Sequence, residues 1–310
     1  MTPSVLGPAV LRSYAPDPDQ YWPVEGSSWL DEIDLTVTAT EAHTRMGTRA
    51  LPEDEWLVYD HLASDEVLLR RRLLTEQRAH VLACSPYAEK SAQEAGALVD
   101  RWLATHVPVS EQGPDTEEAH PLARAGARVQ EDLCVMVHHD GAWRLEGAAL
   151  CFPSLWLLAE KLGLPTALVH QPVPHYAEEL SPKVDRFFDR LPAGRPVWRR
   201  NVSVWPALVL WAPCHDLDPS LWSEGSPRPG APPLWIRSER QTLRRLSESG
   251  AILFTIRVQT MPIAVLMERP DRARDFAAWF RSPMSEGRRR QLGSQLGPML
   301  AWLDQMAATA

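Results

Sequence analysis

The sequence has few of the residues that build common cofactor-binding motifs. Its 310 residues include only 4 cysteines and 16 glycines. The cysteines stand far apart, with no C-x-x-C pair, so their spacing fits neither a zinc ribbon nor an iron–sulfur cluster. The glycines form no G-x-G-x-x-G and no G-x-x-x-x-G-K-[ST] motif. We therefore expect no flavin, NAD or iron–sulfur site in this chain.

Lysine is scarce too, since only Lys90, Lys161 and Lys183 are present and the other basic residues are arginines. The 32 basic residues face 40 acidic ones, which gives a net charge of −8. A protein that binds nucleic acid needs a basic surface, so nucleic acid is not an expected partner. The 45% hydrophobic content is typical of a globular protein with a real core, which excludes disorder.

Long apolar runs are absent as well. The longest uncharged windows, 147–159 and 201–215, contain proline and are shorter than the roughly 18 to 20 residues of a membrane span. The first residues carry no basic stretch followed by an apolar run, so we expect no signal peptide. We predict a cytoplasmic protein with reduced thiols and no membrane partner.

The pattern of apolar residues predicts an α+β fold. Helical periodicity over 68–74 and 87–107 indicates that residues 1–125 are mainly helical, and the leucines and aromatics after residue 266 predict further helices over 266–310. Between them the period changes to two. Alternation on both sides of Asp140-Gly141 predicts a β-hairpin over 131–151, and short helices should begin near Ser154 and Ser181.

Three more strands are predicted at 197–205, 234–243 and 251–260. Together with the hairpin they make one antiparallel sheet with helices to one side. Residues 207–232 contain five prolines and interrupt this order. A structureless connection of this length is either a functional lid or a disordered segment.

Polar residues alternate along the last two predicted strands. They are Arg237, Glu239 and Gln241 in one strand, and Thr255, Arg257 and Gln259 in the other. This alternation predicts a sheet with one apolar and one polar face. The polar face is either solvated or binds carboxylate groups of a ligand, whose planar shape matches the arginine guanidinium.

One histidine lies on a stiff stretch of backbone. His170 precedes Gln171-Pro172-Val173-Pro174-His175, where the prolines restrict the backbone, so its imidazole could serve as an axial iron ligand or have a structural role. His138 and His139 are neighbours in a strand and point to opposite faces, so they do not form one metal site. No G-x-S-x-G or Cys/His signature supports nucleophilic catalysis.

Several uncommon motifs between residues 125 and 265 resemble the haem-dependent oxidative N-demethylase alpha-subunit-like family. These motifs, in chain order, are Gln130-Glu131-Asp132-Leu133-Cys134, Cys151-Phe152-Pro153-Ser154 with Trp156, Glu160-Lys161-Leu162-Gly163, His170 with Pro172-Val173-Pro174, Val184-Asp185 with Phe187-Phe188, Glu239-Arg240-Gln241-Thr242-Leu243, and Leu253-Phe254-Thr255-Ile256-Arg257.

The resemblance implies a PAS-like core over 126–265 that binds haem b. It also implies an activity in which the haem iron activates O2 and a methyl group is removed oxidatively from a small amine. Electrons then come from a separate reductase. This fits the absence of flavin, NAD and iron–sulfur motifs from the chain.

The resemblance also implies roles for single residues. His170 is the expected iron ligand, and His175 is the second choice. Glu239, Arg240 and Gln241 form the expected catalytic motif, because hydrogen-bond donors near a haem decide between oxygen binding and activation. Three arginines, Arg199, Arg200 and Arg257, are expected to bind the cofactor.

Two departures from the family pattern concern the substrate. Val202 and Ser247 stand where the family usually has tryptophan and proline, so a different amine, for example a natural-product intermediate, is the alternative substrate. Two other functional classes stay open. One is a haem-binding PAS-type sensor without turnover, and the other is an interaction module without haem.

Overall fold

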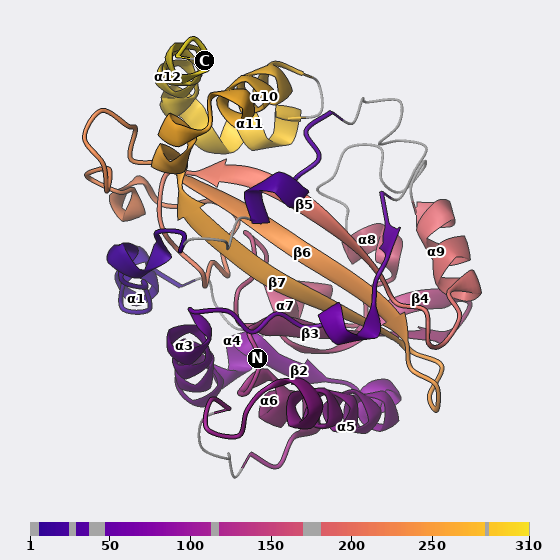
Figure 1. Ribbon diagram of the computed structural model, residues 1–310. Helices are drawn as coiled ribbons and strands as arrows, with labels where there is room; N and C mark the ends of the chain where they lie inside the picture. The colour runs from indigo at the N-terminus through magenta and orange to yellow at the C-terminus, as the bar shows by residue number, and fades with distance from the viewer. Residues whose placement is uncertain are drawn as a thin grey trace.

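The computed structural model describes residues 6–24, 29–36, 47–112, 118–169, 181–282 and 285–309. The strands are β1 (Arg49–Ala50), β2 (Leu82–Cys84), β3 (Glu131–His139), β4 (Ala142–Ala149), β5 (Val197–Trp205), β6 (Trp235–Arg245) and β7 (Ile252–Pro262). The helices are α1 (Pro8–Arg12), α3 (Ala63–Glu76), α4 (Arg78–Val81), α5 (Glu89–His106), α6 (Pro121–Gly126), α7 (Leu158–Lys161), α8 (Thr166–Val169), α9 (Ser181–Arg190), α10 (Pro270–Arg281), α11 (Glu286–Leu292) and α12 (Leu296–Ala307). Figure 1 shows these elements around one long sheet.

The strands form a seven-stranded antiparallel sheet in the order β1-β5-β6-β7-β3-β4-β2. The predicted hairpin is confirmed, because β3 and β4 pair across a turn in which Asp140 and Gly141 have φ values of 49° and 74°. The three later strands are confirmed within two residues at each end. β1 and β2 were not predicted, since strands of two and three residues are too short to show alternation.

The sheet has two faces with different coverings. We define face A as the side that carries Arg200, Arg240 and Arg257, which stand opposite one another on β5, β6 and β7. Face B is the opposite side and carries Arg199, Glu239 and Gln241. The two sets alternate along the strands because successive strand residues point to opposite faces.

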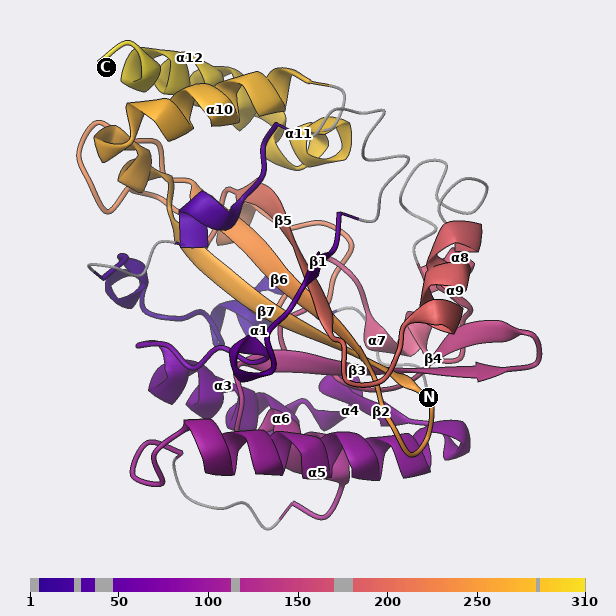
Figure 2. The same ribbon diagram turned by 45° about the vertical axis from the view of Figure 1, so that its right-hand side comes forward.

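Two apolar clusters cover face A at its two ends. At one end α10 and α12 pack on β5–β7 through Phe276, Phe280 and Leu303. At the other end α5 and α6 pack on β3 and β7. In both views, Figures 1 and 2, α10 and α12 lie above the long strands and α5 and α6 lie below them. The middle of face A, between the clusters, lies under residues 21–23, 29–32 and 55–62.

A single large cluster covers face B. It combines α9 and parts of β3 and β4 with the stretch 207–214, in which Leu210 and Trp211 are almost completely buried. The expectation that 207–232 is a lid or a disordered segment is therefore wrong for its first part. Residues 207–212 are all apolar, and they fold into the core despite the neighbouring prolines.

The predicted helices are mostly confirmed, but the expectation that they lie to one side of the sheet is wrong, because α9 packs on face B while α5, α10 and α12 pack on face A. α3, α5 and α9 lie where the periodicity places them, whereas the helix expected from Ser154 begins only at Leu158 and lasts four residues. Within the described ranges, no helix is both long enough and apolar enough to cross a bilayer.

Candidate functional site

The predicted catalytic motif on β6 is divided between the two faces of the sheet. Glu239 and Gln241 lie on face B, and Arg240 lies between them on face A. The register also places polar Gln241 beside apolar Ile256 and Arg240 beside Arg257. The expectation of one polar and one apolar face is therefore wrong, because the polar sides of β6 and β7 point in opposite directions.

The predicted cofactor-binding arginines divide in the same way. Arg199 stands opposite Gln241 on face B, while Arg200 and Arg257 stand on either side of Arg240 on face A. A ligand bound on one face of a sheet cannot contact side chains on the other. The structure therefore gathers the predicted residues into two groups, one on each face.

On face B, Glu239 is held by a group of hydrogen-bond donors. Its Oε1 accepts from Ser154 Oγ at 2.5 Å, and its Oε2 accepts from Asn201 Nδ2 at 2.9 Å and from Gln241 Nε2 at 2.8 Å. Arg237 Nε donates in turn to Ser154 Oγ at 3.1 Å. This chain of donors orients the Ser154 hydroxyl toward Glu239.

The surroundings keep Glu239 ionised. Burial by itself raises the pKa of this carboxyl, but the hydrogen bond from Ser154, the charge of Arg237 and the Asn201 amide outweigh burial and lower the pKa below its usual value. Burial lowers the pKa of Arg237 to about 10, against the charge of Glu239, so this guanidinium also stays charged at neutral pH. The guanidinium carbon of Arg237 lies 4.3 Å from the centroid of the Trp205 ring, which is a cation–π contact.

Around Glu239, face B carries a half-buried patch. Its apolar members, Phe187, Val197 and Phe254, pack at the edge of the face-B cluster. Arg199, Asn201, Glu239 and Gln241 are its polar members, and all four are partly exposed. Ser154 and Arg237 were missed in the sequence, although Ser154 belongs to one of the quoted motifs and Arg237 to the polar alternation.

The predicted iron ligands His170 and His175 lie outside the described residues. Val169, which ends α8 and directly precedes His170, packs against the face-B cluster. α9, the next described element, contributes Phe188 to the same cluster. The connection between α8 and α9 therefore begins and ends on face B.

On face A, the row of three arginines lines a cavity of about 410 Å³. This volume lies within the range of small-molecule pockets. Apolar walls come from Trp22, Pro23, Trp29, Leu57 and Met261, and polar groups come from Glu32, Glu55, Asp60, His61 and Gln259. The cavity occupies the middle of face A, between the two apolar clusters.

Two of the three arginines form ion pairs. Arg257 is fully buried, and its Nη2 lies 2.8 Å from Asp60 Oδ2 while its Nη1 lies 2.7 Å from Glu66 Oε2. Arg200 contacts Glu32 at 2.6 Å. Burial lowers the pKa of Arg200 to about 10, despite Glu32, and the charges of Arg240 and Arg257 act in the same direction. Close packing of three like charges is unfavourable, so these carboxylates are needed to hold the row together.

Arg240 is bonded differently. Its two terminal nitrogens donate to the main-chain oxygens of Trp56 at 3.1 Å and Glu55 at 2.6 Å. Among the described residues no carboxylate lies within ion-pair distance of its guanidinium. Burial lowers the pKa of Arg240 from its usual value.

Two further buried acids on β3 were not predicted as site residues. Glu131 stands beside Arg257 on face A, and Asp132 stands beside Ile256 on face B. Glu131 Oε1 accepts from the Val58 main-chain nitrogen at 2.7 Å, but its Oε2 is buried without a partner among the described residues. Burial raises the pKa of Glu131 to about 7, against the nearby charge of Arg257. Asp132 pairs with Arg70 at 2.8 Å, with both side chains fully buried. The sequence did indicate these two residues, since two adjacent acids within an otherwise apolar strand are unusual.

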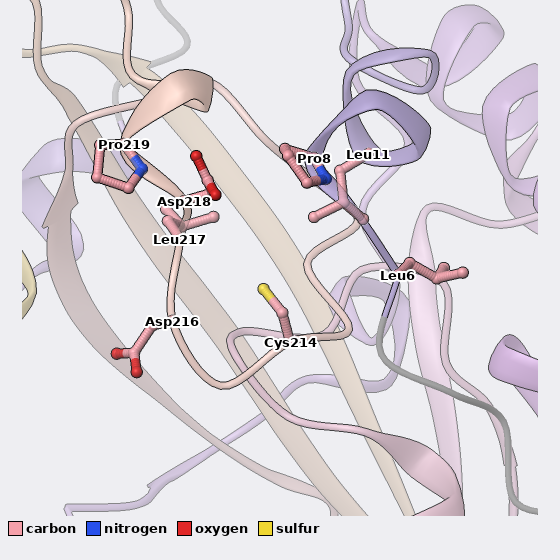
Figure 3. A pocket seen from close by; sticks show the side chains of 8 residues that line it. All are labelled: Leu6, Pro8, Leu11, Cys214, Asp216, Leu217, Asp218 and Pro219. Atoms are coloured by element: carbon pink, nitrogen blue, oxygen red, sulfur yellow. The ribbon is translucent and has the colours of Figure 1, made fainter.

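A second cavity, of about 340 Å³, lies between α1 and residues 214–219 (Figure 3). It contains none of the predicted site residues. Its Cys214 is buried, and burial raises the pKa of the thiol to about 11, so it is not an activated nucleophile. Over the described part of the chain, no three His, Cys, Asp or Glu side chains converge on a possible metal site.

One comparison with known proteins gives a match. The sequence profile of a family described as haem-dependent oxidative N-demethylase, alpha subunit-like, matches residues 47–286. The match covers more than three quarters of the chain and extends beyond the motifs between residues 125 and 265. No curated protein matches the chain.

Proposed function

The chain belongs to the haem-dependent oxidative N-demethylase alpha-subunit-like family, and from this membership we propose that it is a haem-dependent monooxygenase that removes a methyl group from a small amine. The match over residues 47–286 is the observation that carries the proposal. The order of elements supports a PAS-like core, since the hairpin β3–β4 is followed by the short helices α7–α9 and then by β5–β7 in the same sheet.

We place the haem on face B, with His170 as the iron ligand. The segment that contains His170 leaves α8 at Val169, which packs on the face-B cluster. The half-buried patch fits a porphyrin, because Phe187, Val197 and Phe254 offer apolar surface and Arg199 offers a guanidinium suited to a propionate. His175 is the second choice for the ligand.

When bound, the haem supplies oxygen activation, with electrons from a separate reductase subunit. The protein's own contribution centres on Glu239. Each carboxylate oxygen can accept two hydrogen bonds, and Oε1 receives only one among the described residues, from Ser154. A protonated amine can donate to this oxygen, which would hold the nitrogen and its methyl group in a fixed position while Gln241 and Asn201 keep the carboxylate in place.

Reconstitution with haemin tests the ligand assignment. We expect the full-length protein to show a Soret band, and His170→Ala to shift or abolish it. His175→Ala tests the second choice, and His61→Ala is the matched control, since His61 lines the cavity on face A. A preparation without haem affinity, or a His170→Ala variant with an unchanged band, would contradict the proposal.

Turnover is tested separately, with a surrogate reductase and a panel of N-methylated amines. We expect oxygen uptake coupled to formaldehyde release, and a Glu239→Gln variant should lose at least tenfold in kcat/KM through the lost charge–amine contact. Haem binding without oxygen uptake on any amine would instead support a sensor.

A further inference from the structure

The cavity on face A contains chemistry that the proposed demethylation does not use. It lies on the opposite side of the sheet from Glu239 and Gln241, and its lining includes three arginines and three acids. A buried arrangement of this kind is costly unless the charges are paired.

Two of the arginines and two of the acids neutralise each other. Arg257 pairs with Asp60, and Arg200 pairs with Glu32. Asp60 is firmly ionised, since Arg257 and Gln130 lower its pKa to about 2 although burial acts the other way. These pairs are structural, because they fix the covering segments 29–32 and 57–62 to the sheet.

One charge of each sign is left at the cavity. Arg240 donates only to main-chain oxygens, and the carboxylate of Glu55 forms no ion pair among the described residues. The charges of Glu131, Glu32 and Glu55 all act on Arg240, but among the described residues none of these carboxylates lies within ion-pair distance of it. A ligand with one carboxylate and one ammonium group would pair with both.

The remaining walls define the body of such a ligand. Trp22, Trp29, Leu57 and Met261 give the cavity apolar and aromatic sides. Gln259 adds a hydrogen-bonding amide, whose Oε1 accepts from Arg200 at 2.9 Å. A single apolar or aromatic side chain fits the volume of about 410 Å³.

From these observations we infer that the cavity on face A is a second ligand site, which binds a zwitterionic amino acid with an apolar side chain. The ligand's carboxylate would pair with Arg240, its ammonium group with Glu55, and its side chain would lie against Trp22 and Trp29. The inference does not depend on the haem proposal.

Three probes with the same phenyl body separate the charge classes. They are phenylalanine, which is zwitterionic, 3-phenylpropanoate, which is anionic, and 2-phenylethylamine, which is cationic. Calorimetric titration of the full-length protein should show that phenylalanine binds at least tenfold more tightly than the other two, because it alone pairs with both charges. Equal affinities, a preference for either singly charged probe, or no binding would overturn the inference.

Two variants test whether Arg240 pairs with the ligand's carboxylate and Glu55 with its ammonium group. Arg240→Gln should lower phenylalanine affinity about tenfold and remove the advantage over 2-phenylethylamine, and Glu55→Gln should remove the advantage over 3-phenylpropanoate. Because Arg240 also holds main-chain oxygens, the exposed Glu55 is the safer test if Arg240→Gln unfolds. Arg78→Gln, on a surface ion pair with Glu118, is the matched control and should bind phenylalanine normally.

Haemin provides the last test. If the cavity is a separate site, protein saturated with haemin should bind phenylalanine with unchanged affinity. Competition between haemin and phenylalanine would show that the arginine row belongs to the haem site. That result would overturn this inference while leaving haem binding itself intact.

Discussion

Two carboxyl groups, those of Glu239 and Glu131, have different surroundings and therefore different protonation states. Glu131 is almost completely buried, and Glu239 is half-buried. The hydrogen bond from Ser154, the charge of Arg237 and the Asn201 amide lower the pKa of Glu239 in spite of burial, whereas burial raises the pKa of Glu131 to about 7. One carboxyl is therefore ionised at neutral pH, and the other lies near its titration midpoint.

Glu131 should make folding stability depend on pH. Because its pKa in the folded protein, about 7, exceeds its ordinary value of 4.5, the folded state binds more protons than the unfolded state between these pH values. Stability from this group is thus present at low pH and is lost as the pH rises through 7. The loss has an upper limit of about 3 kcal/mol.

A Glu131→Gln variant cannot titrate, so it tests this effect. Its free energy of unfolding, measured with urea at pH 5 and pH 8, should improve relative to the wild type as the pH rises. The same difference between variant and wild type at both pH values would show that Glu131 does not titrate in this range.

Secondary-structure elements were predictable where their periodicity is long. β5, β6 and β7 were found because nine or more residues alternate in each strand, and α5 because its apolar face is continuous over 18 residues. The register between strands was not predictable. Alternation tells which residues of one strand share a side, but only the pairing of Arg240 with Arg257 shows that the polar sides of β6 and β7 are opposed.

The candidate site was predictable only in part for the same reason. Glu239, Gln241 and Arg199 were identified and do lie together. The contacts of Arg257 with Asp60 and of Arg240 with Glu55 join residues almost 200 positions apart, and no local pattern signals them.

The stretch 207–214 should contribute strongly to stability. Leu210 is fully buried in the face-B cluster, so Leu210→Ala should cost about 2 to 5 kcal/mol in free energy of unfolding. Val109→Ala, at a side chain that is 86% exposed, is the control and should change it by less than about 0.5 kcal/mol. Equal, small effects in denaturant unfolding would mean that this stretch is not part of the core.

At the scale of the whole molecule, segments that are far apart in the sequence pack against one another. Residues 29–35 pack with α10 and α12 in one apolar cluster on face A, and the ion pair Arg269–Asp31 lies at its edge. In Figure 2 a short indigo segment from the early part of the chain lies between β5 and the gold and yellow C-terminal helices. Residues 29–35 and the helices α10 and α12 therefore help to hold the same face of the sheet.

This junction should depend on apolar contact more than on charge. Ile33→Ala removes a buried side chain and should cost about 2 to 5 kcal/mol in thermal or urea unfolding. Asp31→Asn removes one member of a partly exposed ion pair and should cost about 1 kcal/mol or less. If the two variants were equally destabilised, the ion pair would be the main link.

Because the two faces of β6 belong to different sites, insertions and deletions in this strand are constrained during evolution. Glu239 and Arg240 are covalent neighbours that belong to different sites, so inserting or deleting one residue beside them would exchange every side chain between the two faces. A change of residue at one position alters one site and spares the other. Related chains that keep both sites should therefore vary in the identity of residues along this strand, while its length stays fixed.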